Sequence, residues 1–139
     1  MTLTAPFPDL FGTEVVIGPA GENNFTGSVW TGIVAHDNVG NRFRLHLVQF
    51  APIGRTKWHK HEFVQHLIIL AGTALVGFED GRAERVVAGR SIIIPPNTVH
   101  WHGATRDAPM AHLAVNFKGE TDWTYPAVSD AEFVSFENR

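Results

Sequence analysis

Hydrophobic residues along the chain fall into short segments rich in Val, Ile, Leu and Phe, and Gly or Pro interrupts the sequence between them. This spacing, without a long helical period, is typical of an all-β sandwich or barrel. We expect strands at Glu14–Ile17, Ser28–Ala35, Arg42–Phe50, Thr56–His61, Val64–Ala71, Thr73–Glu79, Arg82–Val87, Ser91–Ile94, Thr98–Gly103 and Met110–Lys118. So many short strands in one chain require two packed sheets or a closed barrel.

Two local signals refine this picture. Asp80-Gly81 lies between two expected strands and suits a type I′ turn. A short helix is expected at Ser129–Val134, because Ser129 can serve as its N-cap with Glu132 three residues later.

At 139 residues the chain fits one domain. We expect residues 1–21 to form an arm that packs on the barrel or on a neighbouring subunit, and residues 22–139 to form the barrel itself.

Composition narrows the classes of partner. The net charge is −3, from 11 basic and 14 acidic residues without a run of either sign, so neither nucleic acid nor an anionic membrane surface is an evident partner. A small molecule is the expected one. The chain has no cysteine, so His, Gln and carboxylate side chains must supply any metal ligands. The first eight residues lack a basic region and an apolar region, and we therefore expect a cytoplasmic location.

Two histidine clusters carry the strongest chemical signal. His59 and His61 are two residues apart, so an extended strand presents both imidazoles on one face. Gln65 shares their parity, and His100 follows the turn sequence Pro-Pro-Asn in a later hairpin. Three neutral imidazoles and one amide oxygen suit a single divalent metal such as Mn, Fe, Co, Ni or Zn, and leave positions open for water or substrate.

Parity assigns further polar residues to the same cavity. His46 and Val48 face one way on their strand, and His112 and Asn116 share a face with small residues on the last long strand, as in the lining of a pocket. His102 lies two residues beyond the second cluster's ligand and can also face inward. Other roles remain open: His102 could only hydrogen-bond a loop, and His112 could lie behind a ligand or fill the core.

Charged and aromatic residues elsewhere fit structural roles. We expect Arg55 and Lys57 to be solvated strand charges. Trp30, Trp58 and Trp101 fit packing or subunit-interface positions, and Trp123 is expected to pack the C-terminal segment against the barrel.

The spacing of both clusters resembles the two motifs of the cupin superfamily. The first motif is represented by Gly54, His59, His61, Gln65 and Gly72, and the second by Gly89, Pro95, Asn97 and His100. Asn97 stands where the family has glycine, which is acceptable because Asn also tolerates positive φ, and Gln65 replaces the usual Glu. The resemblance implies a single-domain jelly-roll β-barrel.

A narrower similarity, over roughly residues 22 to 136, is to the small manganese-dependent cupin hydroxynitrile lyases of bacteria. It rests on Phe25–Val29, Gly54–His61, Gln65, His100–Ala104, Met110–Ala114 and Asp122-Trp123. That family implies a metal, foremost Mn, on His59, His61, Gln65 and His100, and pocket positions at Thr56, His102, His112, His46, Val48 and Asn116. It also implies a homodimer or homotetramer, with the N-terminal segment and the outer tryptophans at the interface.

The expected reaction is cleavage of a cyanohydrin into a carbonyl compound and cyanide. His102 and His112 are the candidate proton-handling groups, and Thr56 is the third candidate catalytic residue. Gln in place of Glu raises the net charge of the site by one unit, which favours an anionic alkoxide or cyanide. The alternatives are a cupin dioxygenase, an isomerase or cyclase, and a non-enzymatic module that binds a metal and a small molecule.

Overall fold

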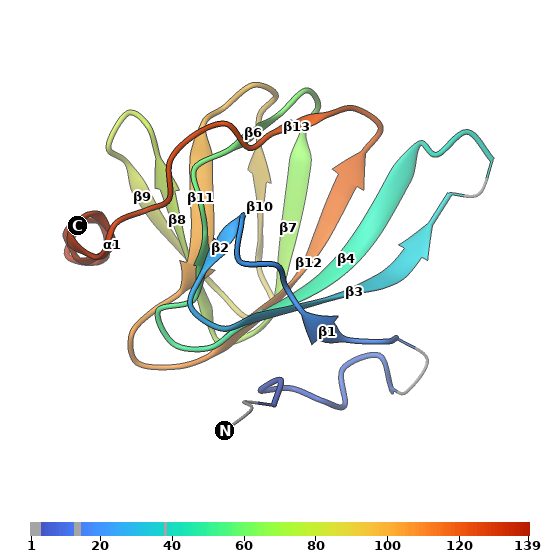
Figure 1. Ribbon diagram of the computed structural model, residues 1–139, viewed down its shortest axis with the longest axis horizontal. Helices are drawn as coiled ribbons and strands as arrows, with labels where there is room; N and C mark the ends of the chain where they lie inside the picture. The colour runs from blue at the N-terminus through green and yellow to red at the C-terminus, as the bar shows by residue number, and fades with distance from the viewer. Residues whose placement is uncertain (1–3, 13–14, 38) are drawn as a thin grey trace.

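The computed structural model describes residues 4–12, 15–37 and 39–139, and it contains two antiparallel sheets that face each other (Figure 1). The larger sheet has the order β1 (Gly18–Pro19), β3 (Val29–His36), β4 (Phe43–Phe50), β12 (Met110–Phe117), β7 (Gln65–Ala71) and β10 (Ser91–Ile94). The smaller has the order β2 (Phe25–Thr26), β5 (Arg55–Thr56), β11 (His100–Ala104), β8 (Thr73–Phe78) and β9 (Ala83–Val87). A separate ladder joins β13 (Thr121–Asp122) to β6 (Lys60–His61). The all-β, jelly-roll prediction is confirmed.

The segment expected as one strand at Thr56–His61 is divided in two. Lys57 donates its backbone N–H to Asn24 O and Trp58 donates to Pro126 O, so these residues bond to loops rather than to one neighbouring strand. Only β5 and β6 remain as strands, and β6 pairs outside the sheet that holds β5. The prediction of a continuous strand was wrong, because its backbone donors find partners in separate segments.

Other strand bounds differ at turns. The strand expected from Thr98 begins at His100, after a turn in which Asn97 has the positive φ of 58° that the sequence allows. The strand expected at Glu14–Ile17 lies partly outside the described residues, and residues 15–17 form none; β1 follows instead. The two-residue strands β2 and β13 were not expected.

The hairpin between β8 and β9 has a wider loop than predicted. Phe78 N–H donates to Arg82 O and Gly81 N–H donates to Phe78 O, which leaves residues 79–81 in the loop. Gly81 has a φ of 93°, whereas Asp80 has no positive φ. The Asp80 carboxylate instead accepts from Arg82 N–H at 2.9 Å. A type I′ turn needs positive φ at both central residues, so that prediction was wrong.

The helix α1 (Asp130–Glu137) covers the outer side of the smaller sheet (Figure 1). Its capping box is the predicted one: Glu132 N–H donates to Ser129 Oγ and Ser129 N–H donates to Glu132 Oε1, both at 3.1 Å. It extends three residues beyond the predicted end, because Phe136 joins Phe133 in an apolar cluster. That cluster also contains Trp58, Leu75, Trp101 and Val128. Trp58 and Trp101 therefore pack as expected.

Arg55 is buried beneath this helix, with 1% of its surface exposed. Its guanidinium donates to the carbonyls of Ile53 and Val128 and to the carboxylate of Asp130. It also lies 4.9 Å from the ring centroid of Phe133. The prediction of a solvated charge was wrong, because these acceptors replace water around the cation.

The main core fills the space between the two sheets and continues into the wall of a pocket. Its members include Phe50, Leu67, Ile69, Val76, Ile94 and Met110, together with Val48 and Ala114, which also line the pocket. On the outer face of the larger sheet, Gln49 exchanges hydrogen bonds with the backbone of Phe7 at 2.8 and 3.0 Å, which holds residues of the N-terminal segment against it. Within the described residues, no helix is long and apolar enough to cross a membrane.

Candidate metal centre

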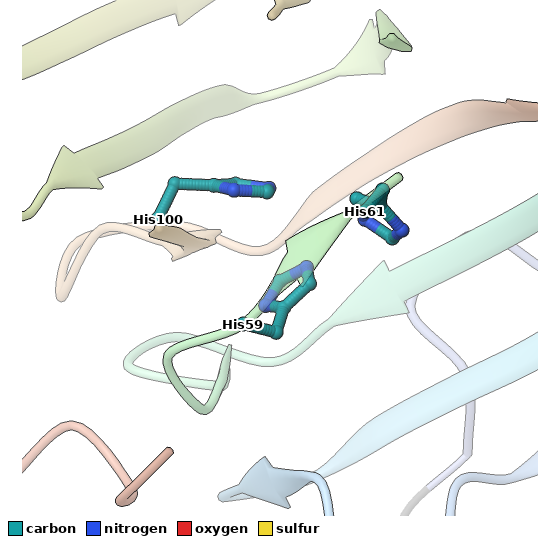
Figure 2. Close-up of side chains that lie close together, drawn as sticks. All are labelled: His59, His61 and His100. Atoms are coloured by element: carbon teal, nitrogen blue, oxygen red, sulfur yellow. The ribbon is translucent and has the colours of Figure 1, made fainter. Parts of the chain in front are cut away.

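The side chains of three histidines, His59, His61 and His100, lie close together (Figure 2). His59 precedes β6, His61 ends it and His100 begins β11. The candidate ligand nitrogens all lie within 4.8 Å of one another. His59 and His100 exchange both backbone hydrogen bonds, at 2.9 Å each, so they are directly opposed and their side chains emerge on one face.

Backbone and hydroxyl acceptors orient these imidazoles. His59 Nδ1 lies 2.9 Å from Lys57 O, and His100 Nδ1 lies 2.8 Å from Thr98 O. A carbonyl oxygen only accepts, so each Nδ1 carries the proton and each Nε2 presents a lone pair. His61 Nδ1 lies 2.9 Å from the Thr121 hydroxyl, and its Nε2 is buried without a partner among the described residues.

Gln65 adds an oxygen to this set. Its Nε2 donates to Asn116 Oδ1 at 2.7 Å, which turns Oε1 toward His100 Nε2 at 3.1 Å. Both facing atoms are acceptors when His100 is neutral with its proton on Nδ1, so no hydrogen bond joins them. A cation between them would satisfy both lone pairs. The three imidazoles and this amide oxygen therefore fit a divalent metal.

Burial keeps the cluster neutral. It lowers the pKa of His61 to about 4 and that of His100 to about 4. The pKa of His59 lies well below its usual value, first because of burial and then because of the neighbouring His100 and His61. Neutral imidazoles are the form that binds a metal, so the cluster is in its ligating state at neutral pH.

A second histidine pair lies beside the first cluster. His112 Nε2 is 3.0 Å from His102 Nδ1, and the other ring nitrogen of each is buried without a partner among the described residues. The His102 ring stacks on that of His100, with centroids 5.6 Å apart. Burial lowers the pKa of His112 to about 4 and that of His102 well below its usual value. Both imidazoles of the pair are therefore uncharged at neutral pH.

A pocket of about 430 Å³ opens beside both clusters. Every position expected to line a pocket does so: His46, Val48, Thr56, His102, His112 and Asn116. His59, His61 and Gln65 also face it. Thr56 Oγ1 accepts from the backbone N–H of His102 at 3.2 Å, which fixes the backbone of that strand beside the pocket.

Sequence reasoning missed two contacts from the β13 segment. Trp123 stacks on the imidazole of His59, with centroids 4.3 Å apart and 22° between the rings, and it lines the pocket. Its ring also lies 6.3 Å from that of Phe25, so Trp123 packs the C-terminal segment against the barrel as expected, and in addition it lies against a candidate ligand. Thr121 holds His61. Thr121 and Trp123 are two positions apart, and this spacing is the sequence signal that their side chains face the same side.

Three comparisons with known proteins identify the family of the chain. A cupin domain model matches residues 46–116. An (R)-mandelonitrile lyase of Granulicella tundricola is 40% identical over 68 residues, which are 49% of this chain and 52% of that protein. The match thus spans about half the length of this curated relative.

Solved structures resemble the chain over more of its length. A cupin-like protein of Thermotoga maritima superposes with a TM-score of 0.79 and 31% identity, covering 84% of this chain and 90% of that one. A polyketide cyclase of Streptomyces resistomycificus superposes with a TM-score of 0.70 and 21% identity, covering 87% and 86%. The second likeness bears on the fold alone. Sequence, topology and histidine cluster agree, and this chain belongs to the cupin family.

Proposed function

We propose that this protein is a metal-dependent lyase of the hydroxynitrile lyase type, which cleaves cyanohydrins into an aldehyde or ketone and cyanide and forms them in reverse. His59, His61, Gln65 and His100 would hold one divalent transition metal per chain, with Mn the first choice and Fe, Zn, Ni or Co also compatible with the ligands. When bound, such an ion acts as a Lewis acid that lowers the pKa of a hydroxyl group brought to an open position.

The buried His102–His112 pair beside the three-histidine cluster is the observation that carries this proposal. With its proton on Nδ1, His102 donates to His112 Nε2 and keeps a lone pair on its own Nε2. That nitrogen has no other partner among the described residues. It is therefore available as a general base for a hydroxyl group in the pocket.

The proton and electron pair can be followed through the reaction. His102 Nε2 takes the hydroxyl proton, the oxygen's electron pair forms the carbonyl, and the carbon–carbon bond breaks with its electrons leaving on cyanide. His102, now doubly protonated, keeps its Nδ1–H bond to His112 and returns the proton from Nε2 to cyanide. The products are a carbonyl compound and hydrogen cyanide, and both histidines end neutral.

Other pocket residues would bind and orient the substrate. Thr56 presents a hydroxyl beside His102, and this hydroxyl accepts a hydrogen bond from the backbone N–H of His102. His46 and Val48 lie on one wall, and Asn116 fixes the amide of Gln65. The partial likeness to an (R)-mandelonitrile lyase supports this choice of reaction. We also propose a cytoplasmic homodimer or homotetramer, which light scattering on the purified protein would test.

The test is benzaldehyde release from mandelonitrile by purified protein that has been stripped of metal and reloaded separately with Mn, Fe or Zn. Assays are run in air and under nitrogen. Release that requires metal and ignores oxygen supports the lyase, and it identifies the working ion. Release from no metal form would contradict the proposal, while oxygen consumption with another substrate would favour a dioxygenase.

A further inference from the structure

Three polar residues form a row across the larger sheet, from the candidate metal centre to the pocket mouth. In the strand register, Asn116 of β12 pairs with Gln65 of β7 on one side and with Arg44 of β4 on the other. Residues paired in this way point to the same face of a sheet. All three line the pocket. The row therefore runs from a candidate ligand, through an amide, to a guanidinium.

Hydrogen bonding along the row leaves donors free at its outer end. Asn116 Oδ1 is occupied by Gln65 Nε2 at 2.7 Å, so the Asn116 amide group remains as a donor toward the pocket. Arg44 forms no side-chain hydrogen bond or ion pair with another residue in the described part of the chain. Its charge nevertheless acts inside the pocket, because it contributes, after burial, to a lowered pKa of His46.

We propose that Arg44 and Asn116 form a subsite for a carboxylate group of the substrate. A guanidinium and an adjacent amide donor match a planar carboxylate, which accepts two or more hydrogen bonds. This assignment rests on the proposed function and names the class of substrate: cyanohydrins, or their carbonyl products, that carry a carboxylate at the end remote from the reacting carbon.

Strand spacing sets how long such a substrate is. Adjacent strands lie about 4.8 Å apart, so the Arg44 and Gln65 backbones are about 10 Å apart across β12. The carboxylate would thus bind about one to two strand spacings from the metal centre. A para-substituted aromatic ring bridges that separation, and a benzaldehyde with a para-carboxylate is the simplest probe.

The remaining charges of the pocket restrict where an anion can bind. Lys118 lies two residues beyond Asn116 and adds a second cation near the mouth. Glu62 and Glu120 line the pocket from other segments, and the backbone N–H of Glu120 donates to the Glu62 carboxylate at 3.3 Å. These two carboxylates balance the charges of Arg44 and Lys118, so we expect the ligand's carboxylate to bind where it reaches Arg44.

Binding of 4-formylbenzoate and of benzaldehyde to the metal-loaded protein, measured by calorimetry, tests the subsite without requiring turnover. We expect 4-formylbenzoate to bind about tenfold more tightly than benzaldehyde. The variant Arg44→Gln should lose this preference and keep its affinity for benzaldehyde. Arg90→Gln is the matched control, because it removes the same charge from an exposed turn outside the pocket.

Equal affinities for the two ligands, or an unchanged preference in Arg44→Gln, would overturn the subsite. A salt titration of the unaltered protein gives a second test that needs no variant: added NaCl should weaken binding of 4-formylbenzoate but not of benzaldehyde. Binding that depends on Arg44 in a protein that releases no benzaldehyde from mandelonitrile would keep the subsite and reject the lyase. Lyase activity without a preference for 4-formylbenzoate would keep the lyase and reject the subsite.

Discussion

The indole of Trp123 stacks on the imidazole of His59, at 4.3 Å between centroids, although 64 positions separate them in the sequence. Two positions earlier, the Thr121 hydroxyl contacts His61 Nδ1. Backbone carbonyls accept from Nδ1 of His59 and from Nδ1 of His100, and so orient these two rings. The β13 segment thus contacts two candidate ligands through side chains, and it forms an outer support for the metal centre.

Trp123 should report metal binding. Mn or Co held by His59 would lie close to the stacked indole, so the fluorescence of Trp123 should fall as metal is added to the metal-free protein. The chain has three other tryptophans, and Trp123→Phe, which keeps a stacking ring, should bind metal with most of this fluorescence change removed. A full change retained in Trp123→Phe would place the metal near another tryptophan.

Loss of the Thr121 hydroxyl should weaken metal binding. Thr121→Val removes the partner of His61 Nδ1 while preserving shape, and residues that orient a ligand typically contribute about 10- to 100-fold to metal affinity. Competition with a chelator measures the change. Thr121→Ser keeps the hydroxyl and should retain most of the affinity. Indistinguishable affinities for the Val and Ser variants would show that this contact does not position His61.

Stability of the metal-free protein should fall as pH is lowered from about 6.5 to about 4. In the folded protein the pKa values of His61, His100 and His112 are lowered to about 4, whereas unfolded histidine titrates near 6.5. Between these values the unfolded state binds protons that the folded state does not, so unfolding is favoured. Above about 6.5 both states are neutral and this effect vanishes.

Thermal unfolding of metal-free protein across this pH range measures the effect. A melting temperature that stays constant from pH 7 to pH 4.5 would contradict the burial of neutral histidines.

Arg55 should be essential to stability although its carboxylate partner is exposed. Arg55→Met removes donors from the buried carbonyl of Val128 and from the carbonyl of Ile53, and we expect a loss of about 2 to 4 kcal/mol in the free energy of unfolding. Asp130→Asn is the control: its side chain is 92% exposed, so it should cost less than about 1 kcal/mol. Urea denaturation compares them, and equal losses would refute the assigned role of the carbonyls.

Metal content should separate ligands from proton-handling groups. His59→Ala and His100→Ala should purify without metal and without activity, because each substitution removes a nitrogen that binds the metal. His102→Ala should retain a full equivalent of metal, measured by mass spectrometry. Metal loss in His102→Ala equal to that in His59→Ala would make His102 a ligand and reject it as the base.

The candidate metal ligands could be predicted because each depends on local geometry. His59 and His61 follow the two-residue period of an extended chain, and Asn97 was recognised as a turn residue that permits positive φ, which places His100 at the start of β11. The inward orientation of His102 and His112 could be predicted from the same two-residue period. Such patterns survive even where a strand is shorter than expected, as β6 is.

Features that depend on distant partners could not be predicted in this way. Arg55 is buried against its acceptor Val128. That acceptor is 73 positions away in the sequence, so local patterns do not reveal the contact. Trp123 reaches His59 from just beyond β13, a strand of only two residues that is too short to be predicted from the sequence. Arg44 acquires its place beside Asn116 from strand register, which is a property of the folded sheet.

In the proposed mechanism, a metal held by the histidine cluster and a neutral His102 together cleave cyanohydrins. Its most direct test is the rate of benzaldehyde release from mandelonitrile under nitrogen, for the Mn-loaded protein and for His102→Ala loaded with the same amount of Mn. We predict metal-dependent release by the unaltered protein and a rate at least about 100-fold lower in the variant. No release by the Mn-loaded protein, or equal rates in both, would contradict the account.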